Sequence, residues 1–148
     1  MKNALILKKN FLKFLLLLAI TTNIGFVQAQ TKTPEKIKQK IEVYYFHPAE
    51  RCPIDQAIEE NTRKLMQSDF AKNIKEGTIK FQVLNTDDKA NAKIVAKFNI
   101  NAQALYIVKI EKGKELKTDL TEFAFSYGQS NPGKFKIGLK EEIMNALK

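Results

Sequence analysis

The chain has 148 residues, one cysteine and one histidine, and its 25 basic residues against 16 acidic ones give a net charge of +9 at pH 7. One cysteine cannot close an intramolecular disulfide, and one cysteine with one histidine cannot supply the ligands of an ordinary zinc site. The lysines are interspersed with acids instead of forming a basic cluster with aromatic residues, so the charge indicates a solvated exterior and no nucleic-acid partner is expected.

The first 29 residues have the pattern of a secretory signal peptide. This segment contains four lysines and no acid, an uncharged apolar run at 14–20, and small residues ending at Ala29 that suit a signal peptidase. An uncleaved membrane anchor is the alternative, but the apolar run is shorter than the roughly 20 residues that a membrane span needs. We therefore expect cleavage after Ala29, which leaves 119 residues with a net charge of +5. The product is expected to be exported, periplasmic or extracellular, with no stable membrane span.

The mature chain is expected to begin with a polar, lysine-rich tail over 30–40, followed by one domain over 41–148. Residues 41–46 are apolar nearly throughout, which is typical of a central strand covered on both faces. Apolar residues at helical spacing predict a helix over 53–74, ended by Gly77. Alternating apolar residues then predict a strand over 78–84.

The next segment is predicted to be a helix that Asp87 or Asp88 caps and Asn99 stops. A third strand is expected over 104–110. The short turn Lys112-Gly113 then leads into a weaker fourth strand around 115–120.

The C-terminal residues are predicted to form two helices. A short helix is expected over 121–127, and Asn131-Pro132 gives the cap and first position of the last helix. Apolar residues at four-residue steps predict the core-facing side of that helix: Phe135, Leu139, Ile143 and Leu147.

The predicted element order is β-α-β-α-β-β-α. The first β-α-β unit requires a parallel pair with a right-handed crossover, and the two-residue turn requires an antiparallel pair. A four-stranded mixed sheet flanked by helices on both faces satisfies both requirements. The fold class is therefore α/β with the thioredoxin-like architecture.

The junction between the first strand and the first helix of the domain carries the only cysteine. With Cys52 as the N-cap and Pro53 at the first helical position, amide donors point toward the sulfur and the neighbouring Arg51 adds positive charge. Both would favour a thiolate. Asp55, one turn along, repels a thiolate. Its first expected role is to accept the N-cap amide at the helix start; a proton shuttle is the alternative.

Four aromatic residues precede this cysteine. His47 stands five residues before the thiol, where it could form a Cys–His pair, but a loop hydrogen bond is the expected role. Tyr44, Tyr45 and Phe46 could line an aromatic site, although at strand spacing they are expected in the core.

Several short segments carry a resemblance to a known family: Tyr-Tyr-Phe-His at 44–47, Arg-Cys at 51–52, Gln103 followed by Ala104 and an aliphatic strand, Asp-Leu-Thr at 119–121 and Asn-Pro at 131–132. Over residues 38–148 the chain resembles the thioredoxin-like superfamily. More narrowly, it resembles a family of small exported bacterial proteins labelled as a nitrophenyl compound nitroreductase subunit. Nothing in the chain reads as a flavin or nicotinamide site, so no cofactor is expected.

Two departures from working thioredoxins stand out. The second cysteine of the family's Cys-x-x-Cys is Asp55 here, and the position where thioredoxins place a cis-proline is Ala104. A cis bond before a residue other than proline costs about 2.5–4 kcal/mol, so Gln103–Ala104 is expected to be trans. The resemblance makes Pro53, Gln103 and Ala104 candidate binding residues beside the thiol.

These features predict an exported thioredoxin-like protein that has lost dithiol catalysis. It would act as a binding or accessory protein, or form single-thiol adducts, through the Arg51–Asp55 region and the Gln103–Ala104 loop. Its partner would be an exported protein or a small thiol. The alternatives are a monothiol oxidoreductase that exchanges disulfides at Cys52, and an accessory subunit whose thiol is incidental and whose interface lies elsewhere.

Overall fold

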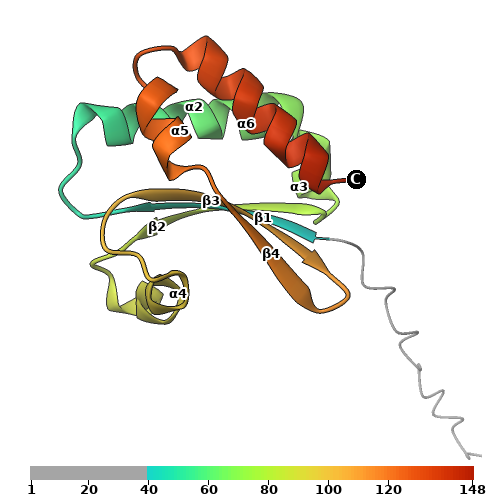
Figure 1. Cartoon of the computed structure of the whole chain (residues 1–148), viewed down its shortest axis with the longest axis horizontal. Coiled ribbons are helices and arrows are strands. Elements are labelled where there is room, and N and C mark those ends of the chain that lie inside the picture. Colours follow the sequence, from blue (N-terminus) through green and yellow to red (C-terminus); the bar gives the residue numbers. More distant parts are fainter. Residues whose placement is uncertain (1–39) are drawn as a thin grey trace, which may run out of the picture. The chain divides into compact units, whose positions relative to one another are not determined.

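The computed structural model describes residues 40–148 (Figure 1). The predictions of a signal peptide and of a polar tail fall almost entirely on residues 1–39 and lie outside the described residues. Four strands are present: β1 (Lys40–His47), β2 (Ile79–Asn85), β3 (Ala104–Glu111) and β4 (Lys114–Asp119). The helices are α2 (Pro53–Asp69), α3 (Ala71–Lys75), α4 (Ala92–Phe98), α5 (Thr121–Tyr127) and α6 (Pro132–Ala146), and a 3₁₀ turn, η2 (Lys89–Asn91), precedes α4.

The strands form one sheet in the order β2-β1-β3-β4. β1 pairs in parallel with β2, while the β1–β3 and β3–β4 pairs are antiparallel. Lys112 and Gly113 have φ values of 51° and 76°, the positive values that a tight two-residue hairpin requires. The predicted fold class is confirmed: an open, mixed, four-stranded sheet is flanked by helices and is compatible with a thioredoxin-like fold.

Helices cover both faces of this sheet. α2, α3, α5 and α6 lie on one face, and α4 lies on the other (Figure 1). Successive residues of β1 point to opposite faces. Tyr45 therefore belongs to the larger core under α2 and α6, whereas Tyr44 and Phe46 belong to a smaller core under α4. All three aromatic side chains are buried, as predicted.

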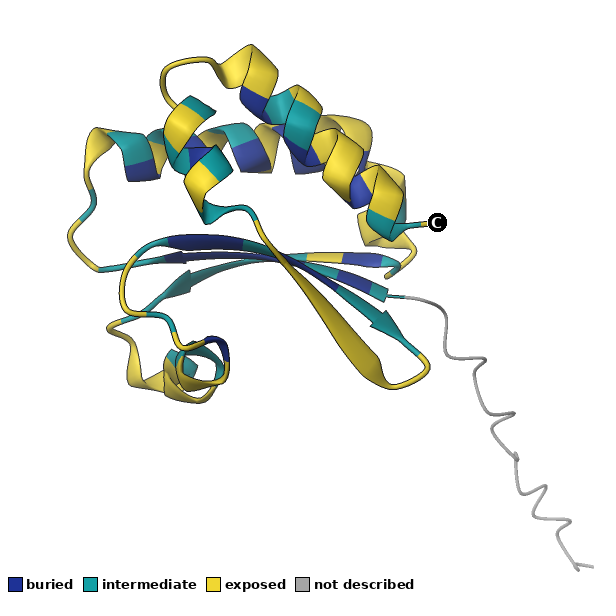
Figure 2. Cartoon of the chain, viewed as in Figure 1, coloured by how far each residue is buried: buried dark blue, intermediate teal, exposed yellow. Residues whose placement is uncertain are grey.

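The last helix docks through the predicted stripe. Phe135, Leu139 and Ile143 are fully buried in the larger core, and Leu147 packs against it at the end of α6. Figure 2 shows this buried side of α6 facing the sheet, with an exposed side turned away. Asn131 caps the helix, because its Oδ1 accepts from the N–H of Lys134 at 3.0 Å.

The helix predicted over 53–74 is two helices. α2 ends at Asp69, and Phe70 leaves the helical conformation at φ −119° and ψ 11° before α3 begins at Ala71. The Phe70 side chain is buried in the larger core. No glycine or proline marks this break, so nothing local in the sequence signals it.

The segment between β2 and β3 follows the predicted caps in part, because Asp88 caps a 3₁₀ turn while the N-cap of α4 is Asn91. Asp88 Oδ1 accepts from the N–H of Ala90 at 2.9 Å, which starts η2 ahead of α4. Asn99 stops α4 in the left-handed conformation at φ 52°.

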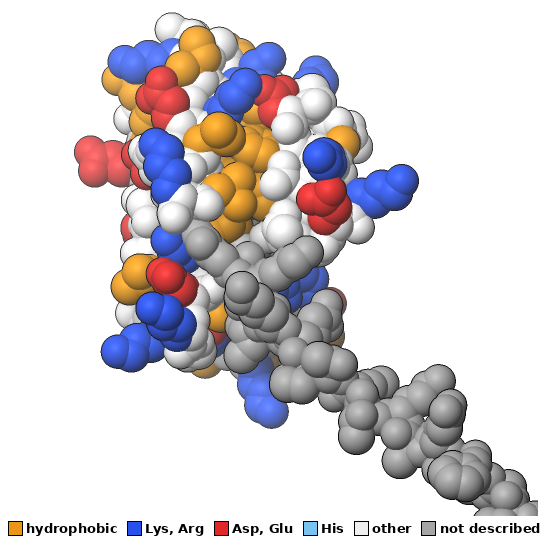
Figure 3. Space-filling view, turned by 90° about the vertical axis from the view of Figure 1, so that its right-hand side faces the viewer, with side chains coloured by type: hydrophobic (Ala, Val, Ile, Leu, Met, Phe, Trp, Pro, Cys, Tyr) orange, Lys and Arg blue, Asp and Glu red, His pale blue; other side chains and the backbone are white. Residues whose placement is uncertain are grey.

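Charges of both signs are intermingled on the surface. On the face seen in Figure 3, basic and acidic side chains surround an apolar area and no single sign dominates. Among residues 40–148, no helix has the length and apolar character required to cross a membrane.

Candidate functional site

The loop from β1 to α2 presents Cys52 to solvent. Cys52 is the N-cap of α2, with extended backbone at φ −84° and ψ 166°, and Pro53 takes the first helical position. Proline suits this position because its fixed φ is helical and it lacks the N–H that would have no partner there. The thiol is free and exposed. The predicted placement of the cysteine at a helix N-terminus is therefore confirmed.

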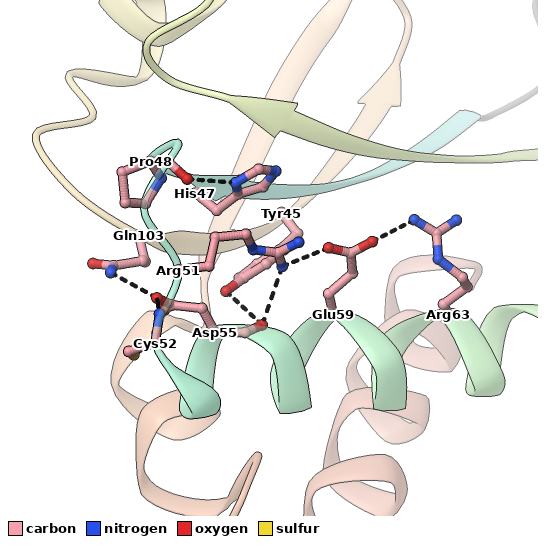
Figure 4. A network of polar contacts seen from close by, with 9 residues as sticks. All are labelled: Tyr45, His47, Pro48, Arg51, Cys52, Asp55, Glu59, Arg63 and Gln103. Carbon is pink, nitrogen blue, oxygen red and sulfur yellow. Dashed lines mark hydrogen bonds and ion pairs between the residues drawn. The ribbon is translucent and has the colours of Figure 1, made fainter.

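Asp55 joins this helix start to the loop before β3. Its side chain is fully buried, and Oδ2 accepts from the Cys52 N–H at 3.0 Å and from Gln103 Nε2 at 3.1 Å (Figure 4). The first bond is the predicted capping bond. The second, to a residue 48 positions away, was not predicted, and it makes Asp55 a structural link between two loops.

The buried Asp55 carboxyl is held in its ionised form. Burial by itself would raise its pKa, but hydrogen bonds from the Cys52 side chain and N–H, then the Gln103 amide and the charge of Arg51, bring the pKa below its ordinary value. A proton shuttle needs a raised pKa to exchange protons near neutral pH. The surroundings of Asp55 therefore favour a structural anion over the shuttle.

Arg51 is directed along α2. Its Nη2 lies 2.5 Å from Glu59 Oε2 and 3.4 Å from the Asp55 carbonyl oxygen, and Glu59 also pairs with Arg63 at 2.6 Å (Figure 4). Together with Gln56 and Glu60, these residues line a surface hollow of about 320 Å³. The Arg51 guanidinium, which was expected to place positive charge beside the sulfur, is therefore ion-paired with the Glu59 carboxylate two turns into α2. The four-residue spacing of Glu59 and Arg63 can be read from the sequence, but the direction in which the Arg51 side chain points cannot.

Two aromatic residues of β1, His47 and Tyr45, form hydrogen bonds near the start of α2. His47 Nδ1 lies 2.8 Å from the Pro48 carbonyl oxygen, which can only accept, so Nδ1 carries the proton. Figure 4 shows the ring turned toward Pro48 and away from Cys52, in the expected loop role. The Tyr45 hydroxyl donates to the Asp55 carbonyl oxygen at 3.0 Å. Burial, and then the charge of Asp55, raise the pKa of Tyr45, so it remains a donor.

The loop before β3 offers one polar side chain to the site. The Gln103–Ala104 peptide is trans, as predicted, since the described residues contain no cis bond. Gln103 faces Asp55, while Ala104 pairs with Phe46 across the sheet and its side chain is buried in the smaller core. Of the three candidate binding residues, Pro53 and Gln103 therefore have exposed or partly exposed side chains, and Ala104 contributes backbone only.

Two electrostatic effects on the Cys52 sulfur oppose each other. The N–H of Asp55 faces the sulfur as in a capping box, and a helix N-terminus stabilises an anion by about 0.3–1 kcal/mol. The ionised Asp55 carboxylate repels an anion. The helix N-terminus and the carboxylate therefore act on the sulfur in opposite directions.

Neither metal-binding clusters nor relatives add to this description. Within residues 40–148, no three histidine, cysteine, aspartate or glutamate side chains gather as a metal would require. When the chain is compared with family models and with the sequences of characterised proteins, none matches.

Proposed function

We propose that this protein is an exported thioredoxin-like binding or accessory protein that has lost dithiol redox catalysis. The site comprises the Arg51–Asp55 helix start and Gln103, with Cys52 at its exposed centre. Its partner is another exported protein or a small thiol. The family resemblance of the sequence and its N-terminal signal pattern support the accessory role and the export.

The observation that supports this proposal most is the structural role of Asp55. A dithiol cycle needs a second thiol next to Cys52 to expel a bound partner. Here position 55 is a buried carboxylate that holds the Cys52 loop and Gln103 together. The side chain has a structural task that a resolving thiol does not have, and no other cysteine exists in the chain.

The exposure of Cys52 favours one alternative, a monothiol oxidoreductase. In that reaction the Cys52 thiolate attacks a disulfide, forms a mixed disulfide and releases the other half as a thiolate. An external thiol then attacks the mixed disulfide and regenerates Cys52. A buried thiol would have favoured the third hypothesis, an accessory subunit whose thiol is incidental and whose interface lies elsewhere, but Cys52 is exposed.

A disulfide-reduction assay with a capture experiment distinguishes these functions. The wild-type protein should not catalyse the reduction of insulin by dithiothreitol above the rate of dithiothreitol alone. Immobilised wild-type protein and Cys52→Ser should retain the same envelope proteins, with the same sensitivity to reductant. Turnover that Cys52→Ser abolishes, or partners held by wild-type protein only through reducible bonds, would instead establish the monothiol oxidoreductase.

A site variant tests where the partner binds. Gln103→Ala removes one amide from the proposed surface, whereas Gln56→Ala removes an exposed amide from the neighbouring turn of α2. Capture by Gln103→Ala should fall several-fold, and capture by Gln56→Ala should remain at the wild-type level. Equal retention by both variants would place the interface elsewhere and contradict the proposed site.

A further inference from the structure

We propose that the protein forms a weak, two-fold symmetric dimer in which the outer faces of two α6 helices pack antiparallel. The outer face is a surface hollow of about 540 Å³ on α6, lined by Ile137, Lys140, Glu141, Met144, Asn145 and Lys148. The inference goes beyond the proposed function, because none of these residues belongs to the site around Cys52.

Two large apolar side chains are exposed to solvent on this face. Ile137 is 62% exposed and Met144 is 47% exposed. Residues seven apart lie on the same side of a helix, two turns or about 10 Å from each other along its axis. The face lies opposite the buried stripe of Phe135, Leu139 and Ile143, and it is turned away from the sheet (Figure 2). Exposed apolar side chains with polar residues around them are typical of a protein-interaction surface.

The charges at the centre of the outer face indicate that a second copy of the chain fits it. Lys140 and Glu141 are neighbours of opposite charge, and the midpoint between Ile137 and Met144 falls between them. A two-fold axis through this midpoint, perpendicular to α6, makes the two helices antiparallel. Ile137 of each copy then lies opposite Met144 of the other, and Lys140 of each lies opposite Glu141 of the other.

A parallel pair of helices does not fit the same residues. It would place Lys140 against Lys140 and Glu141 against Glu141, and directly opposed like charges are unfavourable. In the antiparallel pair the face is complementary to itself, as the interface of a two-fold dimer requires. The charges therefore determine the direction of the pairing.

The contacts within the chain leave these charges able to pair with a second copy. Glu141 has no ion-pair partner among residues 40–148. Lys140 Nζ lies 2.7 Å from Asp69 Oδ2, but an ammonium group has three donors and can bind a second carboxylate. Lys148, at the end of the face, would lie opposite Gly133 of the other copy, which has no charged side chain.

The size of the face limits the strength of the dimer. α6 has 15 residues and is about 22 Å long. One helix pair of this length buries less than the roughly 1,200–2,000 Å² of a stable, specific interface. Interfaces of that standard size have Kd values from micromolar to picomolar, so the Kd of this dimer should lie above about 1 µM.

Sedimentation equilibrium at low ionic strength tests this dimer with charge-exchanged variants. Between about 5 µM and about 500 µM, the mean mass of wild-type protein should rise from one chain toward two. Lys140→Glu and Glu141→Lys each place like charges across the two-fold axis, so each alone should weaken dimerisation at least about tenfold. An equimolar mixture of the two variants should regain it, because the acidic pair of one chain then faces the basic pair of the other.

Glu142→Lys and Lys136→Glu are the matched controls, because they make the same charge changes on α6 outside the outer face. Both should dimerise as wild type does, and circular dichroism checks that every variant folds. Wild-type protein that remains monomeric over the whole concentration range would overturn the inference, whether or not the variants fold. A mixture of Lys140→Glu and Glu141→Lys that associates no more strongly than either variant alone would overturn it as well.

Discussion

Asp55 holds three separate parts of the chain together. Its carboxylate accepts from Cys52 and Gln103, and its carbonyl oxygen accepts from the Tyr45 hydroxyl and from Arg51. A buried donor or acceptor that loses its partner costs about 1–3 kcal/mol. The aspartate therefore fixes the conformation of the thiol loop, and a small residue in its place would leave both Cys52 and Gln103 without a partner.

The ionisation of Asp55 should make the stability of the domain depend on pH. Its pKa is lower in the folded protein than the unfolded value of about 3.9. The stabilisation is therefore present above pH 3.9 and is lost as the pH falls through the lower, folded value. In urea unfolding between pH 6 and pH 3, Asp55→Asn should lose less stability than wild type. Equal losses in the two proteins would contradict this assignment.

A disulfide can test the geometry of the helix start. Disulfides require Cα atoms about 4.4–6.8 Å apart, a range that residues three apart at a helix N-terminus can meet. Asp55→Cys should therefore form a bridge with Cys52 under mild oxidant, detected as a two-proton mass loss and as protection from alkylation. Ile54→Cys is the control, because residues two apart on a helix do not face each other. If Asp55→Cys stays reduced or only dimerises, the assigned helix start is wrong.

The sequence predicted the local part of this site and missed the tertiary part. The bond between Cys52 and Asp55 follows from a three-residue spacing at a helix start, so it could be predicted. The bond from Gln103 depends on how β3 pairs with β1, and the direction of Arg51 depends on where α2 lies. Such contacts join residues far apart in the chain or depend on a loop conformation, and no spacing pattern encodes them.

At the scale of elements, α6 offers a direct measure of how strongly a helix is docked. Leu139 is fully buried, whereas Ile137, two residues earlier on the same helix, is 62% exposed. Leu139→Ala should lower the free energy of unfolding by about 2–5 kcal/mol, since it deletes a buried side chain and leaves a cavity. Ile137→Ala should change it by about 0.5 kcal/mol or less. Similar small losses for both, measured by urea unfolding, would mean that α6 does not dock through this stripe.

Most elements could be predicted because residues at their ends start or stop a helix or form a turn for local physical reasons. An element begins or ends in the predicted way at Asn99, at Asn131 and at the Lys112-Gly113 turn. The break at Phe70 was not predictable, because it arises where a buried aromatic side chain packs in the core and not from a local breaker. Packing overrode the continuous helical pattern of 53–74 there.

At the scale of the whole molecule, two connections determine the sheet topology. The long crossover through α2 and α3 makes β1 and β2 parallel, and the two-residue turn makes β3 and β4 antiparallel. The mostly apolar character of β1 places it inside the sheet, where β2 and β3 flank it. The fold class follows from these few constraints, whereas the identity of the partner depends on surface chemistry that they do not restrict.

Export is a prediction that concerns the whole chain, and the processing of its N-terminus can be tested directly. The basic, apolar and small-residue pattern of residues 1–29 predicts cleavage after Ala29, so the exported protein should begin at Gln30 and lack the mass of the first 29 residues. Because the described domain starts at Lys40, cleavage there removes none of its strands or helices.

Ala29→Lys should block this cleavage, because signal peptidases require a small residue before the cut. Intact mass measurement and cell fractionation should then find a longer, membrane-retained precursor for Ala29→Lys and a shorter, released protein for wild type. Gln30→Glu, one residue beyond the cut, is the control and should be processed at the same bond as wild type. If wild-type protein keeps Met1 or remains in the membrane fraction, residues 1–29 are not a cleaved signal.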